Sequence, residues 1–400
     1  MKKYLLLVTS IIVFAFIDIK SLLIIMIGAF YSYAIFKTKL INKKYGLLSI
    51  IPFVLLLIIT KIPNSIISIF SYSYLGLKII SFLIDSNRRK IGKANIVDYL
   101  LYIFYLPTIF VGPILRYTDF EECLLSPVVN KDNTKEGIYR ITLGLIKKII
   151  IANRFSLIID NVVSSGYEGL YVLVVLLIYV VYLYFDFSGA IDIVNGVSLL
   201  LGYRIKENFN NPLFSSSVKE FWSKWHISLS TLLKDYIYIP LGGKRKHKAI
   251  NVIITFIVSG IWHGLNYVLW GLINGILVII NYKPKNKYWA IILNYLLISI
   301  SFIFFIYPDI TTSLERFISI FSISSFDISL LFEGLNIAEL IITIMFVILV
   351  LIIEKNSYTF MYKMNDNKFI LIYGLTLIVI LTLGKYGFGF DGSAFVYSRF

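Results

Sequence analysis

The sequence contains little cysteine and little histidine. Its 400 residues include one cysteine, Cys123, and three histidines. A single cysteine excludes an internal disulfide and a CxxC metal pair, and it gives little support to a cysteine-bound covalent intermediate. Three histidines and one cysteine also provide no metal-ligand cluster of the usual spacing, so we expect no metal site. Any thiol chemistry is therefore expected to come from a partner molecule.

Charged residues are also scarce. They make up 15% of the chain, whereas hydrophobic residues make up 58%, and the mean hydropathy is +0.81. A soluble domain of this size could not keep such a composition in water, so the chain is expected in a bilayer. Apolar runs approaching the ~20 residues that cross the hydrocarbon core recur along the sequence. The sequence therefore predicts a single polytopic membrane domain over residues 1–400.

The positive charges indicate the topology. A net charge of +15 could suggest nucleic-acid binding, but Lys and Arg lie in short loops between apolar runs, so no nucleic-acid partner is expected. By the positive-inside rule these loops and the N-terminus are expected in the cytoplasm. Residues 1–16 are interpreted as an uncleaved first span, because no small-x-small cleavage site follows. The basic residues are Lys2, Lys3, Lys37, Lys39, Lys43, Lys44, Arg88, Arg89, Lys90 and Lys93.

The apolar runs give the candidate spans. They lie near 4–17, 21–36, 45–60, 64–85, 95–114, 137–165, 168–186, 188–202, 250–262, 264–281, 287–307, 338–354 and 367–386. Roughly ten to twelve are expected to cross, because several are shorter than the ~17-residue minimum and fit re-entrant or interfacial helices.

The polar and aromatic segment 203–250 interrupts these spans. A polytopic protein has little reason to insert such a segment unless it lines a cavity or contacts a substrate. Ser217 to Glu220 fits a capping box, and the residues that follow separate into two faces at 100° per residue, which predicts an amphipathic helix over 218–238. An interfacial helix with tryptophans at headgroup level explains the pattern equally well. One face carries Trp222, Trp225, His226, Leu229, Leu233 and Tyr236, and the other carries Lys224, Ser228, Thr231 and Asp235.

His263 lies in the motif GIWHG at 260–264, between two apolar runs. A titratable ring at or below the membrane surface is costly, and the flanking glycines let a ligand or helix approach the backbone. The unperturbed pKa of imidazole, near 6.5, suits it to take a proton from a hydroxyl and return one to a leaving group. A merely hydrogen-bonded ring is the alternative for His226 or His263 taken alone. His247, in the basic loop, is explained by solvation.

Two further places carry polar groups at membrane depth. Asp186 opens the run 188–202, in which Ser188, Asp192 and Asn195 share a face. These side chains either line a polar funnel or form hydrogen bonds between helices. Residues 110–117 end a span with glycine and proline, which indicates a broken helix beside a cavity or a span terminus with a snorkelling arginine, Arg116.

The strongest motifs lie between residues 184 and 275. They are YFDFSG at 184–189, ENFNNP at 207–212, EFWSKWHISLS at 220–230, KDYIYIPLGG at 234–243 and GIWHG at 260–264, with GPILRYTDF at 112–120 and FVYSRF at 395–400 outside that region. Together they resemble the membrane-bound O-acyltransferase (MBOAT) family, within it the bacterial branch of alginate O-acetyltransferases and the teichoic-acid D-alanyl transfer protein. The IPLGG continuation resembles the polysaccharide O-acetyltransferase side more closely.

The resemblance implies that His263 is the catalytic histidine and His226 the second active-site histidine. With it we expect an all-α ring of membrane helices around a central funnel in the plasma membrane. No bound cofactor is expected. Candidates for the substrate channel are Trp222, Trp225, Asp235, Tyr236, Trp262, Asp186, Ser188, Asp192 and Arg116.

The implied reaction moves an acyl group, acetyl in the first instance, from a thioester donor onto a hydroxyl of a cell-surface polysaccharide. The donor is acetyl-CoA or an acylated carrier protein, and an extracytoplasmic SGNH-type protein is the expected partner beside membrane lipid. D-alanyl transfer to teichoic acid is the alternative within the family. A transporter or lipid flippase would show paired broken helices in corresponding halves, for which the sequence gives no sign. A catalytically silent scaffold would not require the histidines.

Overall fold

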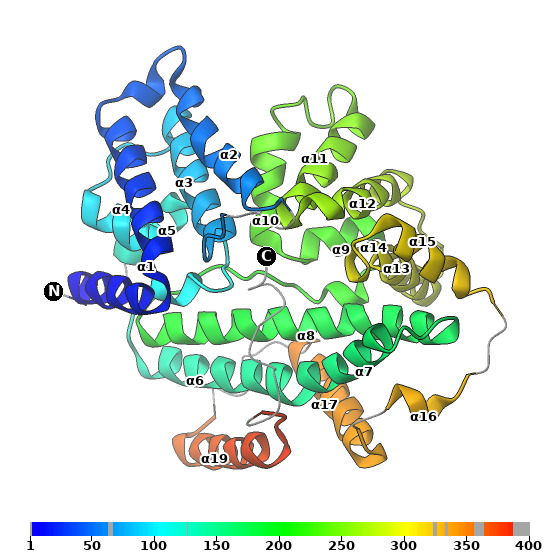
Figure 1. The fold of residues 1–400 in the computed structure, drawn as a ribbon. Helices are drawn as coiled ribbons and strands as arrows, with labels where there is room; N and C mark the ends of the chain where they lie inside the picture. Colours follow the sequence, from blue (N-terminus) through cyan, green and yellow to red (C-terminus); the bar gives the residue numbers. More distant parts are fainter. Residues whose placement is uncertain are drawn as a thin grey trace.

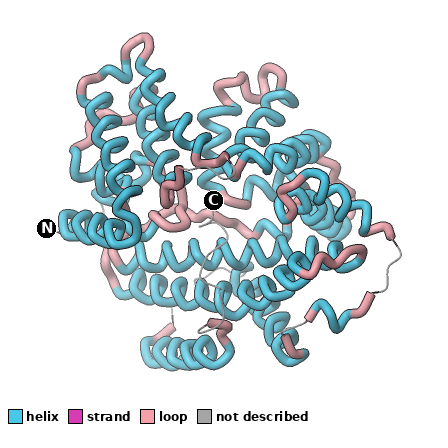
Figure 2. The backbone as a smooth tube through the Cα atoms, viewed as in Figure 1, coloured by secondary structure: helices cyan, strands magenta, loops and turns pink. Residues whose placement is uncertain are grey.

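Helices form all the regular secondary structure of the residues described, which are 2–62, 67–125, 127–322, 326–332, 335–355 and 364–386 of a computed structural model (Figure 1, Figure 2). The sequence FVYSRF at 395–400 and the start of the predicted span 64–85 lie outside these ranges. The all-α polytopic membrane class is confirmed, and the number of crossings stays a prediction. Helices long and apolar enough to span a membrane cover Lys2–Lys37, Leu170–Leu200, Lys287–Ile306, Ile337–Lys355 and Asp366–Leu383.

The helices follow the predicted runs with several differences in where they end. Their bounds are α1 Lys2–Lys37, α2 Ile51–Ile59, α3 Tyr72–Asn87, α4 Ile96–Ile103, α5 Tyr117–Leu125, α6 Lys131–Leu145, α7 Asn153–Ser164, α8 Leu170–Leu200, α9 Val218–Lys224, α10 Ile227–Leu233, α11 Lys248–His263, α12 Val268–Ile280, α13 Lys287–Ser301, α14 Ile303–Ile306, α15 Ile310–Ser319, α16 Ile328–Leu331, α17 Ile337–Lys355 and α19 Asp366–Leu383.

The predicted spans 4–17 and 21–36 form one helix, α1, that bends at Asp18. Asp18 has extended backbone angles, φ −155° and ψ 95°. Its carboxylate accepts hydrogen bonds from the Ser21 backbone N–H (3.1 Å) and hydroxyl (2.6 Å). Asp18 therefore caps the second half of α1 and satisfies a backbone donor that the bend would leave without an intrahelical acceptor.

The predicted spans 168–186 and 188–202 are also one helix, the 31-residue α8. The expectation that Asp186 opens a span is wrong, because α8 continues without interruption through Asp186 and Gly189. A Cβ added to Gly144 of α6 would lie 2.4 Å from the carbonyl oxygen of Gly189, and one added to Gly196 would lie 2.5 Å from that of Gly137. These glycines let the backbones of α6 and α8 approach closely.

The pair formed by α6–α7 and α8 divides the molecule (Figure 1). A π-helical segment, Ile146–Ala152, joins α6 to α7, and α8 packs along all three. Helices α1 to α5 and α9 to α15 lie above this pair in Figure 1, and α17 and α19 lie below it. The site described below belongs to the upper group.

Basic loops from distant parts of the sequence meet on one side of the molecule. The Asn87 side-chain amide donates to the carbonyl oxygen of Ile41 (2.6 Å), and the Arg88 guanidinium donates to that of Asp235 (3.1 Å). The loops after α1 and α3 therefore adjoin the start of the basic segment before α11. This common side is what the positive-inside rule requires of loops that face the same compartment.

The close contact of α6 and α8 predicts a position-specific loss of stability. Gly144→Ala forces the two backbones apart and is expected to cost about 1–3 kcal/mol, seen as a lower Tm in detergent. Gly374→Ala in α19 is the matched control, because a Cβ there meets nothing within 4 Å. Equal Tm values for the two variants would contradict the packing described.

Candidate active site

The segment predicted as one helix over 218–238 is broken in the middle. Helix α9 ends at Lys224, Trp225 is extended, and His226 has a left-handed backbone with φ 45° and ψ 55°. Helix α10 then begins at Ile227 and continues into a π-helical turn, Lys234–Tyr238. The single amphipathic helix is therefore wrong, because helical periodicity in the side chains does not report a local change in backbone angles.

Neighbouring groups satisfy the backbone at this break. Asn210 donates its N–H to the carbonyl oxygen of Lys224 (3.0 Å), and Ile227 donates its N–H to that of Asn208 (2.9 Å). The hydroxyl of Ser230 donates to the carbonyl oxygen of Trp225 (3.2 Å). The loop 208–210 thus replaces the intrahelical bonds that α9 and α10 lose, as a break inside a membrane protein requires.

The break turns the imidazole of His226 into the interior. The residue is 3% exposed, and its ring packs edge-on against Phe187 of α8 at a centroid distance of 4.8 Å. Its Nδ1 lies 3.4 Å from the side-chain amide nitrogen of Asn208 and 3.4 Å from the hydroxyl of Ser228. The ring is therefore held by the loop and by α8 together.

His263 is the last residue of α11 and is 5% exposed. The next residue, Gly264, has φ 150° and ψ 154°, a conformation open almost exclusively to glycine, so the chain leaves the helix directly after the ring. Trp270 of α12 and Phe305 of α14 each pack edge-on against the imidazole with centroids 5.4 Å away. Aromatic walls on two sides therefore fix its orientation.

Trp262 connects the two histidines. Its indole lies 5.9 Å from the His226 ring and 4.7 Å from the His263 ring, measured between centroids. The indole nitrogen donates to the carbonyl oxygen of Ser73 in α3 (3.2 Å), which fixes the side chain. The two imidazoles thus contact one indole, whose position is fixed from α3.

Both histidines line one cavity of about 1250 Å³. It lies between α9–α10 and the α11–α12 pair, and its walls include Trp222, Trp225, Phe256 and Trp270. The opposite end carries exposed basic side chains. Because α11 has 16 residues and rises ~1.5 Å per residue, Lys248 lies about 22 Å from His263 along the axis. The basic lining residues are Lys219, Lys234, Lys244, Arg245 and Lys248.

The other residues singled out from the sequence fall into separate groups. Trp222 and Trp225 line the cavity. Arg116 forms an ion pair with Asp235 (2.7 Å), and its guanidinium lies 5.1 Å from the ring centroid of Tyr236, so these three form a cluster outside the cavity lining.

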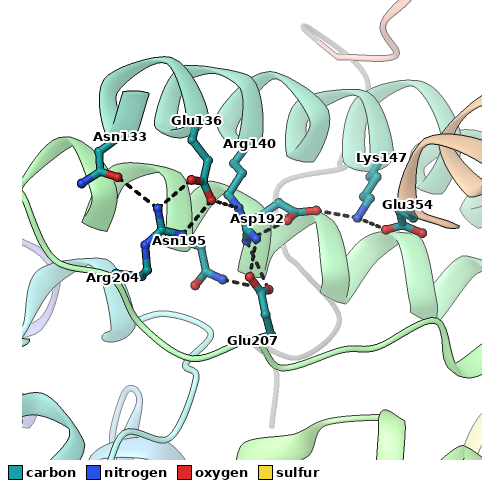
Figure 3. Close-up of polar contacts among 9 residues, drawn as sticks. All are labelled: Asn133, Glu136, Arg140, Lys147, Asp192, Asn195, Arg204, Glu207 and Glu354. Carbon is teal, nitrogen blue, oxygen red and sulfur yellow. Dashed lines mark hydrogen bonds and ion pairs between the residues drawn. The ribbon is translucent and has the colours of Figure 1, made fainter. Parts of the chain in front are cut away.

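The polar residues of α8 serve an ion network between helices (Figure 3). Asp192 pairs with Lys147 and Arg140, and Lys147 also pairs with Glu354 of α17. Asp186 pairs with Lys148, and Ser188 is buried in the same helix. The sequence allowed two roles for these side chains, a polar funnel or contacts between helices. Asp186 and Asp192 make contacts between helices, and neither residue lines the cavity.

Sequence reasoning missed several residues of the site. Asn208 belongs to the motif ENFNNP, which served only the family resemblance, and Trp270 and Phe305 lie in apolar runs that gave no further signal. Lys147 and Lys148 could have been noticed, because two adjacent charges inside the apolar run 137–165 are costly unless paired.

Comparisons with known proteins identify the family of the chain. The model of the membrane-bound O-acyltransferase family matches residues 5–282. A probable alginate O-acetylase of Pseudomonas syringae pv. tomato is 32% identical over 337 residues, which are 78% of this chain and 62% of that protein. A peptidoglycan O-acetyltransferase of Helicobacter pylori is 30% identical (56% of this chain, 46% of that protein). A teichoic acid D-alanyltransferase of Bacillus subtilis is 30% identical (54% and 59%). The chain spans about three fifths of the length of the alginate O-acetylases it matches.

The cavity predicts where a water-borne reagent reaches the interior. In a Cys123→Ser background, Ser259→Cys on the cavity wall is expected to react with a small anionic methanethiosulfonate, which the basic mouth attracts. Ser299→Cys, buried in α13 outside the cavity, is the matched control and is expected to stay unmodified. Mass spectrometry of the intact protein measures both, and equal labelling would argue against the cavity.

Proposed function

Because the chain belongs to the membrane-bound O-acyltransferase family, we propose that it transfers an acyl group from a thioester to a hydroxyl, with His263 as general base. The observation that carries this proposal is that two buried imidazoles both contact the indole of Trp262 and both line one cavity with a basic mouth. Neither a transporter nor a silent scaffold needs that arrangement.

The cavity suits a donor with phosphate groups and a long arm. Cationic side chains at the mouth favour phosphate, and the aromatic wall beyond them favours an apolar chain. The distance of about 22 Å from Lys248 to His263 requires the acyl group to be carried at the end of an extended, flexible arm. Both acetyl-CoA and an acylated carrier protein present a thioester on such an arm. The positive-inside rule favours a cytoplasmic position for the basic mouth.

The reaction balances with the groups present. His263 takes the proton of the attacking hydroxyl, whose oxygen forms a bond to the thioester carbonyl carbon. The carbon–sulfur bond then breaks, and the imidazolium returns the proton to the departing sulfur, which leaves as a thiol. An ester and a free thiol are the products, with no net change at the protein. His226 lines the same cavity, where it would orient the donor or stabilise the oxyanion.

The acceptor we propose is a hydroxyl of a cell-surface polysaccharide, and the acyl group is acetyl. The motif IPLGG at 239–243 and the similarity to the alginate O-acetylases favour this assignment over D-alanyl transfer to teichoic acid. An extracytoplasmic SGNH-type partner protein would support polysaccharide acetylation. A carrier protein with its own adenylating ligase would instead indicate D-alanylation.

Separate alanine substitutions test the catalytic assignment. His263→Ala removes the base and is expected to lower acylation of the cell-surface polymer by about 10²–10⁴-fold, the usual contribution of a positioned acid–base group. His226→Ala is expected to lower it as well. Membrane abundance, measured by immunoblot, must match the unsubstituted protein. Unchanged acylation in both variants would leave a scaffold as the better description.

Charge reversal tests the mouth. Lys244→Glu with Lys248→Glu is expected to raise the KM for the donor at least about tenfold while kcat changes little, because each lost bond to phosphate is worth ~1.5–3 kcal/mol. Lys43→Glu with Lys44→Glu makes the same charge change on exposed residues that do not line the cavity. Equal KM values for the two double variants would place the donor elsewhere.

A further inference from the structure

Asn208 has a side-chain orientation that the backbone determines. The Ser228 N–H donates to its Oδ1 at 2.9 Å, and a backbone N–H can only donate. The oxygen of the amide therefore faces Ser228, and the NH₂ group faces Nδ1 of His226 at 3.4 Å. Because an NH₂ group donates and does not accept, Nδ1 must be the acceptor in this contact.

Ser228 presents a second donor to the same nitrogen. Its hydroxyl oxygen accepts the backbone N–H of Ile114 (3.2 Å), which leaves the hydroxyl hydrogen available. That oxygen lies 3.4 Å from Nδ1 of His226. The Asn208 amide and the Ser228 hydroxyl can therefore both donate to an unprotonated Nδ1, whereas a proton on that nitrogen would oppose the amide.

From these contacts we infer that Asn208 is a positioning residue that holds His226 in the tautomer protonated at Nε2. The partner of one ring nitrogen determines which nitrogen carries the proton in a neutral imidazole. The inference rests on the proposed function for its catalytic meaning and divides the roles of the two histidines. With Nε2–H, His226 is a hydrogen-bond donor at the edge of the ring opposite Asn208 and cannot accept a proton there. The basic role therefore falls to His263, and His226 stabilises the oxyanion.

Side chains just before Asn208 anchor its loop to α6 and α8 (Figure 3). Glu207 pairs with Arg140 of α6 and accepts from the Asn195 amide of α8 (3.3 Å). Arg204 pairs with Glu136 of α6 (2.6 Å). Asn208 itself is fully buried. The ion pairs of Arg204 and Glu207 and the contacts with the broken backbone thus hold the amide of Asn208 in place.

Nitrogen-15 NMR of the full chain, labelled at histidine, tests the inference without turnover. The chain has three histidines, so His247→Gln and His263→Gln variants assign the signals. We expect the unsubstituted protein to show His226 with an unprotonated Nδ1 and a protonated Nε2. A protonated Nδ1 at neutral pH would overturn the inference, whatever the activity.

Asn208→Asp supplies the chemical contrast. One carboxylate oxygen still accepts the Ser228 N–H, and the other now requires a donor at Nδ1, so the tautomer is expected to switch. Loss of the Nε2–H donor predicts a decrease of about 10²–10³-fold in kcat, the usual cost of one oxyanion donor, with donor KM within about twofold. Asn210→Asp adds the same charge on an exposed side chain of the same loop and is expected to change neither signal nor kcat.

The outcomes separate this inference from the proposed function. A switched tautomer with a lowered kcat supports both. A switched tautomer in a protein whose His263→Ala variant keeps full activity supports the positioning of His226 and rejects the catalytic proposal. An unswitched tautomer in Asn208→Asp, or an equal loss of kcat in Asn210→Asp, rejects the positioning role of Asn208 and leaves the acyl-transfer proposal in place.

Discussion

The break in the backbone beside His226 is the constraint on which the candidate site depends. A chain that leaves the helical conformation within a membrane protein has N–H and C=O groups for which hydrocarbon offers no partner. Here the segment 208–210 supplies partners on both sides of the break, at Lys224 and at Ile227. The left-handed conformation of His226 is thus maintained by a distant segment of chain. The direction of its imidazole follows from that support.

Buried charges and close helix packing secure the supporting segment. Glycines let α6 and α8 approach until their backbones touch, which brings the side chains of Arg140 and Asp192 together beside Glu207. Removal of one partner from such a buried network leaves an uncompensated charge, and this makes each of its members costly to replace. Helices that do not line the cavity therefore determine where an imidazole within it lies.

The sequence located the two imidazoles but not the geometry that joins them. His226 and His263 could be identified because a histidine at membrane depth is costly and the chain has few. Side-chain periodicity stayed helical through Trp225 and His226, so the break between α9 and α10 could not be detected. Asp186 was predicted to open a span, whereas it lies inside α8, where Gly189 contacts the backbone of α6. A glycine at the end of a helix and a glycine at a helix–helix contact look the same in sequence, and tertiary packing decides between the two roles.

The basic mouth carries a consequence for biogenesis. By the positive-inside rule, the lysines and arginine between 244 and 248 are expected to keep their loop on one side of the bilayer during insertion, and Lys244 and Lys248 also line the mouth of the cavity. If a related protein evolved to use a less anionic donor, it could not simply lose these basic residues. Their loss would also remove a signal for membrane orientation, and the chain could then insert in the inverted orientation. Related proteins with other donors are instead expected to carry their basic residues at different positions of the loop. The orientation of the chain is then retained while the lining of the mouth changes.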